Sequence, residues 1–156
     1  NLGDADVRGY ELETGRKWDA FELGLGVWNS DNRFADKALT DADLGLGTSI
    51  GRTWTARFDW APQGHAGRYG LRARHVESEA NLITPTAPAK PAYTVVDLLS
   101  EWKLGRAQQF SVGIALNNLL NEFYYDHATY GYHSSGKYIG FPAMGRELRL
   151  SLGVHF

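Results

Sequence analysis

Aromatic, imidazole and carboxylate side chains are concentrated in one segment of this chain, residues 124–138. The segment reads Tyr-Tyr-Asp-His-Ala-Thr-Tyr-Gly-Tyr-His-Ser-Ser-Gly-Lys-Tyr. Tyrosine phenolate and histidine imidazole can ligate haem iron, and histidine with aspartate suits divalent metals such as zinc. Aromatic rings also stack on flat ligands. The candidate substrate-binding residues are Tyr125, His127, Tyr130, Tyr132, His133 and Lys137, with His127 and His133 as candidate metal ligands.

A purely structural role for these residues stays open. Long loops commonly hold tyrosine and histidine side chains that pack on one another, and the segment lacks a recognised metal spacing such as His-Glu-x-x-His. His75, near the end of a predicted strand, is a further candidate. We expect His155 to form an internal hydrogen bond and His65 to be solvated in a turn.

Catalytic patterns are missing from the sequence. It has no Gly-x-Ser-x-Gly nucleophile motif, no phosphate-binding glycine loop, and no carboxylate pair with a positioned histidine. Glu11 and Glu13 share one face of a predicted strand, where pairing with arginine is the expected role. The sequence therefore predicts no catalytic residues and no enzyme.

Charge and composition exclude several other classes. Lys and Arg number 16 against 18 acidic residues, a net charge of -2, so nucleic acid is not an expected partner. The chain has no Cys, which rules out disulfides and thiolate metal sites. No run reaches the ~20 apolar residues of a membrane-spanning helix.

The elements that must position the loop are strands. In residues 144–156, Leu148, Leu150, Leu152, Val154 and Phe156 share one parity, and polar residues or glycine take the other. Successive side chains of a strand point to opposite faces, so one face of this strand is apolar throughout. The same alternation recurs at residues 10–14, 21–27, 54–60, 69–73, 96–104 and 110–116. Helical periodicity is favoured nowhere, and the predicted class is all-β.

The opposite faces carry charge mixed with small residues, as the lumen of a wide barrel would require. The charged residues predicted on these faces are Arg57, Asp59, Arg72, Arg74, Asp97, Glu101, Lys103, Glu147 and Arg149. Small residues such as Gly24, Gly26, Gly70 and Gly113 lie between them. These charges could line the path of a substrate. Water on one face of a soluble sheet would sort the residues in the same way.

Loop lengths distinguish these cases. Turns near residues 15–17, 61–67 and 105–108 are short, whereas 29–42, 79–92 and 119–143 are long, which is the pattern of periplasmic turns and extracellular loops. Residues 43–51 also alternate. We favour about seven spanning strands, with 43–51 extending a strand or forming a hairpin arm above the membrane. Residues expected in interfacial aromatic girdles are Trp18, Trp28, Trp54, Trp60, Tyr69 and Trp102.

Four motifs in order resemble the carboxy-terminal third of a TonB-dependent outer-membrane receptor. Residues 9–13 resemble its G-x-E-x-E strand and residues 93–98 its Y-x-x-x-D-L strand. Residues 117–125 resemble its N-N-L-F-[DN]-x-x-Y-Y segment, and residues 145–156 its closing strand with a terminal aromatic.

The resemblance implies that residues 1–156 form the carboxy-terminal portion of an antiparallel transmembrane β-barrel of about 22 strands. The plug domain and energy-coupling box would lie outside this chain. It also implies import of a metal chelate, energy from the TonB complex, and the outer membrane of a Gram-negative bacterium as the location. No intrinsic cofactor is expected; an iron-siderophore complex or haem would be the transported ligand.

Two other functions stay open. One is a self-contained eight-stranded outer-membrane barrel acting as an anchor, adhesin or stability protein. Eight strands enclose an interior filled by side chains, so the small inward residues suit a wider lumen better. The other is a soluble two-sheet binding protein.

Overall fold

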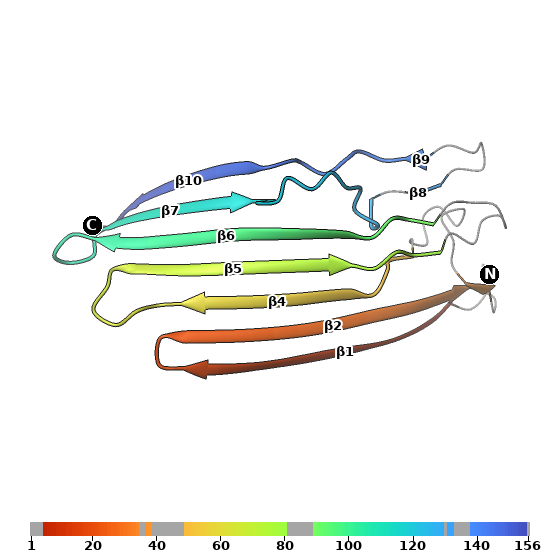
Figure 1. The fold of residues 1–156 in the computed structure, drawn as a ribbon, viewed down its shortest axis with the longest axis horizontal. Coiled ribbons are helices and arrows are strands. Elements are labelled where there is room, and N and C mark those ends of the chain that lie inside the picture. Colours follow the sequence, from red (N-terminus) through yellow and green to blue (C-terminus); the bar gives the residue numbers. More distant parts are fainter. Residues whose placement is uncertain are drawn as a thin grey trace.

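A computed structural model describes residues 5–34, 37–38, 49–80, 89–129, 131–132 and 138–155. The fold is an antiparallel meander of seven long strands, as Figure 1 shows. They are β1 (Ala5–Trp18), β2 (Phe21–Phe34), β4 (Thr53–Trp60), β5 (Gly67–Val76), β6 (Tyr93–Leu104), β7 (Phe110–Asn117) and β10 (Glu147–Val154). Among the described residues, no helix is long and apolar enough to cross a membrane.

The strands are ordered β1-β2-β4-β5-β6-β7-β10, so each pairs with its neighbours in the chain. Three two-residue strands complete the set: β3 (Lys37–Ala38) pairs with β2, and β8 (Gly131–Tyr132) pairs with β9 (Tyr138–Ile139). Strands β1 and β10 lie at opposite edges, and the sheet is unclosed. The all-β prediction with about seven long strands is confirmed.

The pairing register aligns the apolar residues of all seven strands on one face, which we call the outer face. Leu23 pairs with Phe58, Phe58 with Leu71, and Leu71 with Leu98. The row continues through Leu116 to Leu148. The opposite parity, which includes Arg57 and Arg72, forms the inner face. Large hydrophobic side chains of the outer face stay exposed, Leu150 at 67% and Leu152 at 84%, as expected for a surface that contacts lipid.

An aromatic ladder crosses the outer face at the end with the short turns. The rings of Phe21 and Trp60 stack at 6.2 Å, those of Trp60 and Tyr69 at 5.2 Å, and Tyr69 meets Trp102 edge-on at 6.0 Å. This row fits the aromatic girdle expected where a barrel meets the membrane interface. Trp28 does not belong to it, because it pairs with Glu11 and Thr53 on the inner face. Its inclusion among the girdle residues was wrong.

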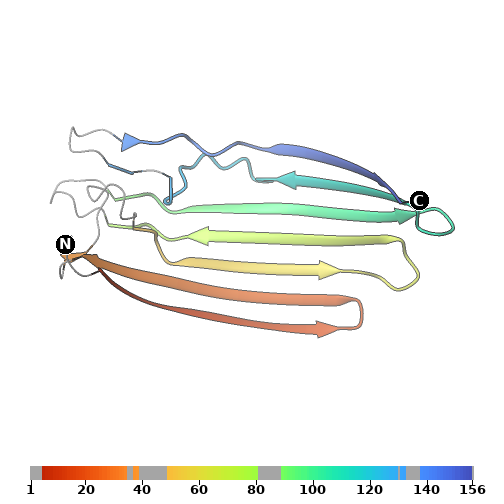
Figure 2. The ribbon, with the colours of Figure 1, turned by 180° about the vertical axis from the view of Figure 1, so that it is seen from behind.

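Short and long connections lie at opposite ends of the strands (Figure 2). The turn predicted near residues 15–17 is wrong, because β1 continues to Trp18 and the turn is Asp19–Ala20. Gly15 instead lies within the strand, where an added Cβ would be 3.0 Å from the Leu23 carbonyl oxygen. Strand β2 also extends into the predicted loop 29–42, as far as Phe34. Residues 43–48 lie outside the described part of the chain.

The large buried side chains of the described residues lie at the end with the long connections. The buried apolar side chains are Val76, Tyr93 and Val95, packed by Ile50 and Tyr124. Tyr93 and Val95 belong to the inner face, and the segment that follows β7 folds back over them. A small cap therefore closes one end of the inner face, while the rest of that face stays open.

Candidate functional site

A ladder of alternating charges crosses the inner face from β2 to β5. Arg57 donates to the Glu22 carboxylate at 2.7 Å and lies 3.8 Å from the Asp59 carboxylate. Arg72 donates to Asp59 at 2.7 Å and also to the carbonyl oxygens of Phe58 and Leu71, both at 3.1 Å. The side chains are 31–52% exposed, so each pair contributes only about 0–1 kcal/mol to stability.

Glycines on the inner face provide room for the two guanidinium groups. A Cβ added at Gly24 would lie 3.3 Å from Nε of Arg57, and one added at Gly70 would lie 3.2 Å from Nη1 of Arg72. The arginine side chains therefore lie flat along the wall instead of projecting across the space in front of it. This explains the small residues that the sequence places between the inward charges.

A second charged group lies nearer the cap. Arg74 pairs with Asp126 at 3.2 Å, and its guanidinium carbon lies 5.4 Å from the centre of the Tyr93 ring. The ring of Tyr124 stacks on that of Tyr93, with ring centres 4.3 Å apart. An aromatic pair and a cation thus border the open inner wall.

The loop that follows β7 is anchored by two asparagines in the left-handed backbone region. Asn118 has φ +50°, and its backbone N–H donates to the Asp97 carboxylate at 2.8 Å. Its side-chain amide donates to the carbonyl oxygens of Glu122 and Met144. Asn121 has φ +53° and accepts from the Arg146 amide at 2.9 Å. Asparagine tolerates this conformation better than most residues, which gives the Asn-rich motif of residues 117–121 a physical role.

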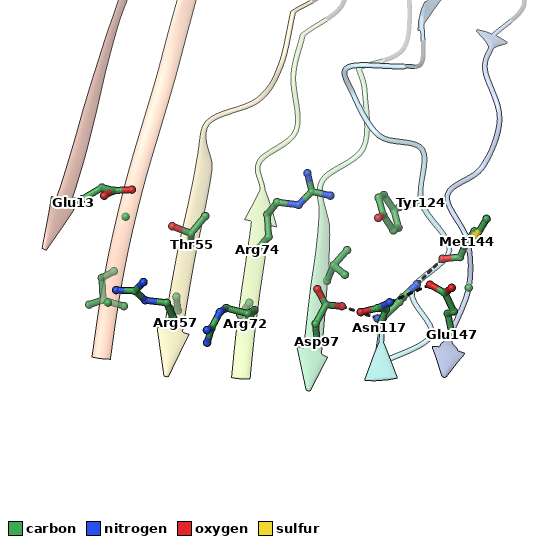
Figure 3. Close-up of a pocket in the computed structure, with 18 of the residues that line it drawn as sticks. Glu13, Thr55, Arg57, Arg72, Arg74, Asp97, Asn117, Tyr124, Met144 and Glu147 are labelled. Atoms are coloured by element: carbon green, nitrogen blue, oxygen red, sulfur yellow. Dashed lines mark hydrogen bonds between the residues drawn. The ribbon is translucent and has the colours of Figure 1, made fainter. Parts of the chain in front are cut away.

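These groups surround a hollow of about 560 Å³ on the inner face (Figure 3). Charged and polar side chains from six strands line it, with Tyr124 and Met144 at the capped side. The labelled lining residues are Glu13, Thr55, Arg57, Arg72, Arg74, Asp97, Asn117, Tyr124, Met144 and Glu147. Such a surface can hold a polar or charged ligand, or a polar protein segment, through charge-assisted hydrogen bonds.

His127 is fully buried and joins three connections. Its Nδ1 accepts a hydrogen bond from the Gly51 amide at 3.2 Å, so Nδ1 carries no proton. Nε2 therefore donates to the Pro91 carbonyl oxygen at 3.0 Å. Lys90, also fully buried, donates to the carbonyl oxygens of Ser49 and His127 at 2.9 and 3.3 Å. A ligand could reach the His127 ring only after these bonds break.

The other candidate binding residues are only partly placed. Tyr125 is half-buried, and its ring contacts Phe123 edge-on at 5.6 Å. Tyr132 lies on β8, while Tyr130, His133 and Lys137 lie outside the described residues. Within the described part of the chain, no three His, Cys, Asp or Glu side chains are grouped as a metal site would require. His75 points to the outer face and contacts Thr94. The binding role of these residues stays a prediction.

The aromatic and cationic groups of the hollow were only partly foreseen. Alternation placed Arg57, Arg72 and Arg74 on the inward face, but no pattern in the sequence indicated that Tyr124 would border them. Its contact with Tyr93 depends on the path of the chain after β7, which no local pattern encodes.

The sequence of this chain matches a known protein family. A family model described as "TonB dependent receptor-like, beta-barrel" matches residues 1–119. The chain belongs to this family. TonB-dependent receptors are outer-membrane proteins of Gram-negative bacteria, and this chain is therefore part of an outer-membrane protein. No curated protein matches its sequence.

Solved structures match nearly the whole of the given sequence. The FrpB iron transporter from Neisseria meningitidis, F3-3 variant, is 27% identical with a TM-score of 0.74, over 96% of this chain and 24% of that one. The F5-1 variant is 25% identical with a TM-score of 0.76 and the same coverage. The copper transporter OprC is 15% identical with a TM-score of 0.75, over 99% of this chain and 24% of that one. At this level of identity the similarity supports the fold alone. The chain spans about a quarter of the length of these structures.

Proposed function

We propose that this chain is the carboxy-terminal part of the barrel wall of a receptor that imports a metal chelate with energy from the TonB system. The chelate would be a siderophore complex, haem or another metal complex. The observation that carries the proposal is the charged hollow of about 560 Å³ on the inner face, lined from all seven long strands and kept open by glycines. The similarity to an iron transporter supports the metal.

The physical argument concerns the charges. Arg57, Asp59 and Arg72 pair along the wall and retain solvent exposure, whereas burial of unpaired charge would be costly. A barrel whose interior was filled only by side chains would have to bury them. A wide lumen, occupied by water and a polar plug, keeps them solvated. We infer that the remainder of the receptor supplies both the plug and the missing strands.

The self-contained eight-stranded barrel requires the first and last strands to pair. In the described part of the chain, β1 and β10 lie at opposite edges of the sheet and do not pair with each other. Nothing in the structure favours this alternative, and we do not retain it.

Ligand capture would fall to the segment 124–138. We propose that Tyr125, Tyr130, Tyr132 and Lys137 contact the chelate, and that His133 and, after release of its backbone bonds, His127 could donate to the metal. A chelate leaving this segment would pass the Arg57–Asp59–Arg72 ladder once the plug moves.

Uptake of radioactive iron chelates by cells that depend on the full-length receptor tests the proposal. Uptake should require an intact TonB system, and Arg57→Gln with Arg72→Gln should lower it several-fold. Arg33→Gln, on the outer face of β2, is the matched control and should leave uptake unchanged. Absence of TonB-dependent uptake for siderophore complexes, haem and other metal complexes would refute the transport function.

A further inference from the structure

Arg74 differs from the other arginines that line the hollow in the source of its counter-charge. Arg57 and Arg72 pair with carboxylates on the wall itself, at 2.7 Å in each case. In the pairing register Arg74 lies between Thr55 on β4 and Val95 on β6, and neither side chain carries a charge. The neighbouring strands therefore leave this cation to be balanced by a group from outside the sheet.

Asp126, in the segment that follows β7, supplies that charge through a single contact. Nη1 of Arg74 donates to Oδ2 of Asp126 at 3.2 Å. An arginine has more N–H donors than this contact uses, and no other described residue accepts a hydrogen bond from Arg74. The Arg74 side chain is 40% exposed and lines the hollow beside Tyr124 (Figure 3). Its remaining donors are thus accessible to a ligand in the hollow.

Asp126 keeps other partners if the contact with Arg74 breaks. Its Oδ1 accepts the Ala128 backbone N–H at 3.0 Å, and its carbonyl oxygen accepts the Thr129 backbone N–H at 2.9 Å. These bonds close a turn that does not involve the wall. A partly exposed ion pair contributes little to stability, so Arg74 can exchange its partner at small cost.

The other carboxylates of the hollow leave room for an anion at Arg74. Glu13 lies at the same level of the wall, but on β1. Three strand spacings separate it from β5, about 14 Å, which exceeds the Debye length of about 8 Å at physiological salt. Asp97 lies one step along the inner face of β6 and already accepts the Asn118 backbone N–H at 2.8 Å.

We propose that Arg74 binds an anionic group of the transported chelate in place of Asp126, and that this exchange releases the start of the segment 124–138 from the wall. A guanidinium can hold a carboxylate through two parallel hydrogen bonds, whereas Asp126 provides one contact. The inference rests on the proposed function of the hollow and names the class of its ligand, a chelate that presents a carboxylate or another oxyanion.

The test is the binding of two iron(III) complexes to the purified full-length receptor in detergent, followed by tryptophan fluorescence. Ferric citrate is anionic, and iron(III) tris(acetohydroxamate) is neutral. Arg74→Gln should weaken ferric citrate at least about tenfold. Asp126→Asn keeps an acceptor for the Ala128 amide but removes the competing charge, so it should tighten ferric citrate several-fold. Arg52→Gln breaks an ion pair with Glu77 at the same end of the sheet and is the control, with unchanged binding.

Hydrogen exchange of peptides that span residues 124–129 reports the release. Ferric citrate should speed this exchange in the wild type, and Arg74→Gln should already exchange at the faster rate without the ligand. Heat-dependent migration on a gel checks that each variant is folded.

The opposite signs of the two substitutions distinguish ligand exchange from a purely structural ion pair, which either substitution would break alike. The proposal is overturned if both variants shift ferric citrate affinity in the same direction, or if the wild type prefers the neutral complex or binds no ferric citrate. Unchanged exchange of residues 124–129 on addition of ferric citrate would overturn the release. The assay needs no TonB, so loss of TonB-dependent uptake would refute the transport function, and these binding results would refute the exchange at Arg74 alone.

Discussion

Replacing His127 with leucine should loosen the cap without unfolding the barrel. Leucine fills much of the buried volume but leaves the Gly51 amide and the Pro91 carbonyl without their side-chain partner. A buried polar group that loses its partner costs about 1–3 kcal/mol, and two such groups cost about 2–6 kcal/mol. The cost falls on the local opening of the three connections, because seven paired strands hold the rest of the sheet.

Hydrogen exchange of peptides that contain Gly51 measures this directly. A loss of 2 kcal/mol predicts exchange about 30-fold faster than in the wild type, since RT is about 0.59 kcal/mol, and larger losses predict faster exchange. His65→Leu removes an exposed histidine from a short turn at the opposite end and is the control. If the Gly51 amide exchanges at the wild-type rate in His127→Leu, the proposed role of His127 in holding the three connections together is refuted.

Three further predictions concern the faces, the cap and the aromatic ladder. Leu150→Arg should lower the unfolding free energy in lipid vesicles by about 2–4 kcal/mol, while Ser151→Arg, one residue on and facing inward, should cost far less; equal losses would contradict the assignment of faces. Gly51→Ala would press a Cβ against the Glu77 backbone carbonyl. The melting temperature should therefore fall, and the hydrogen-exchange rate of peptides near residue 51 should rise. Trp60→Ala removes the stacking contacts with Phe21 and Tyr69 and should lower the free energy of unfolding by about 1–3 kcal/mol. An unchanged midpoint of urea unfolding would contradict a stabilising role of the aromatic ladder.

Strand positions and faces could be predicted because the membrane imposes a simple rule on them. Leu148, Leu150 and Leu152 must all meet hydrocarbon, so their spacing reveals both the strand and its orientation. The rule fails where the strand leaves the membrane. Residues 29–33 of β2 are all polar, so the alternation is lost there, and the sequence was interpreted as a loop.

Glycine misled the prediction of the first turn for a related reason. Gly15 resembles a turn residue in sequence, yet it lies in β1 opposite Gly24, where the two strands approach closely. The cap could not be predicted at all, since Gly51 and His127 are 76 residues apart. Local patterns specify which face a residue occupies, but not which distant backbone atom it will bind.

The two-faced strands also constrain how such a chain can change over generations. Loss of a single codon within β4 would turn every later side chain of that strand to the other face of the sheet. Arg57 would then face the lipid hydrocarbon, or Phe58 the lumen. Changes of length are therefore tolerable chiefly in the long connections, which is where descendants of this gene are free to acquire new ligand preferences.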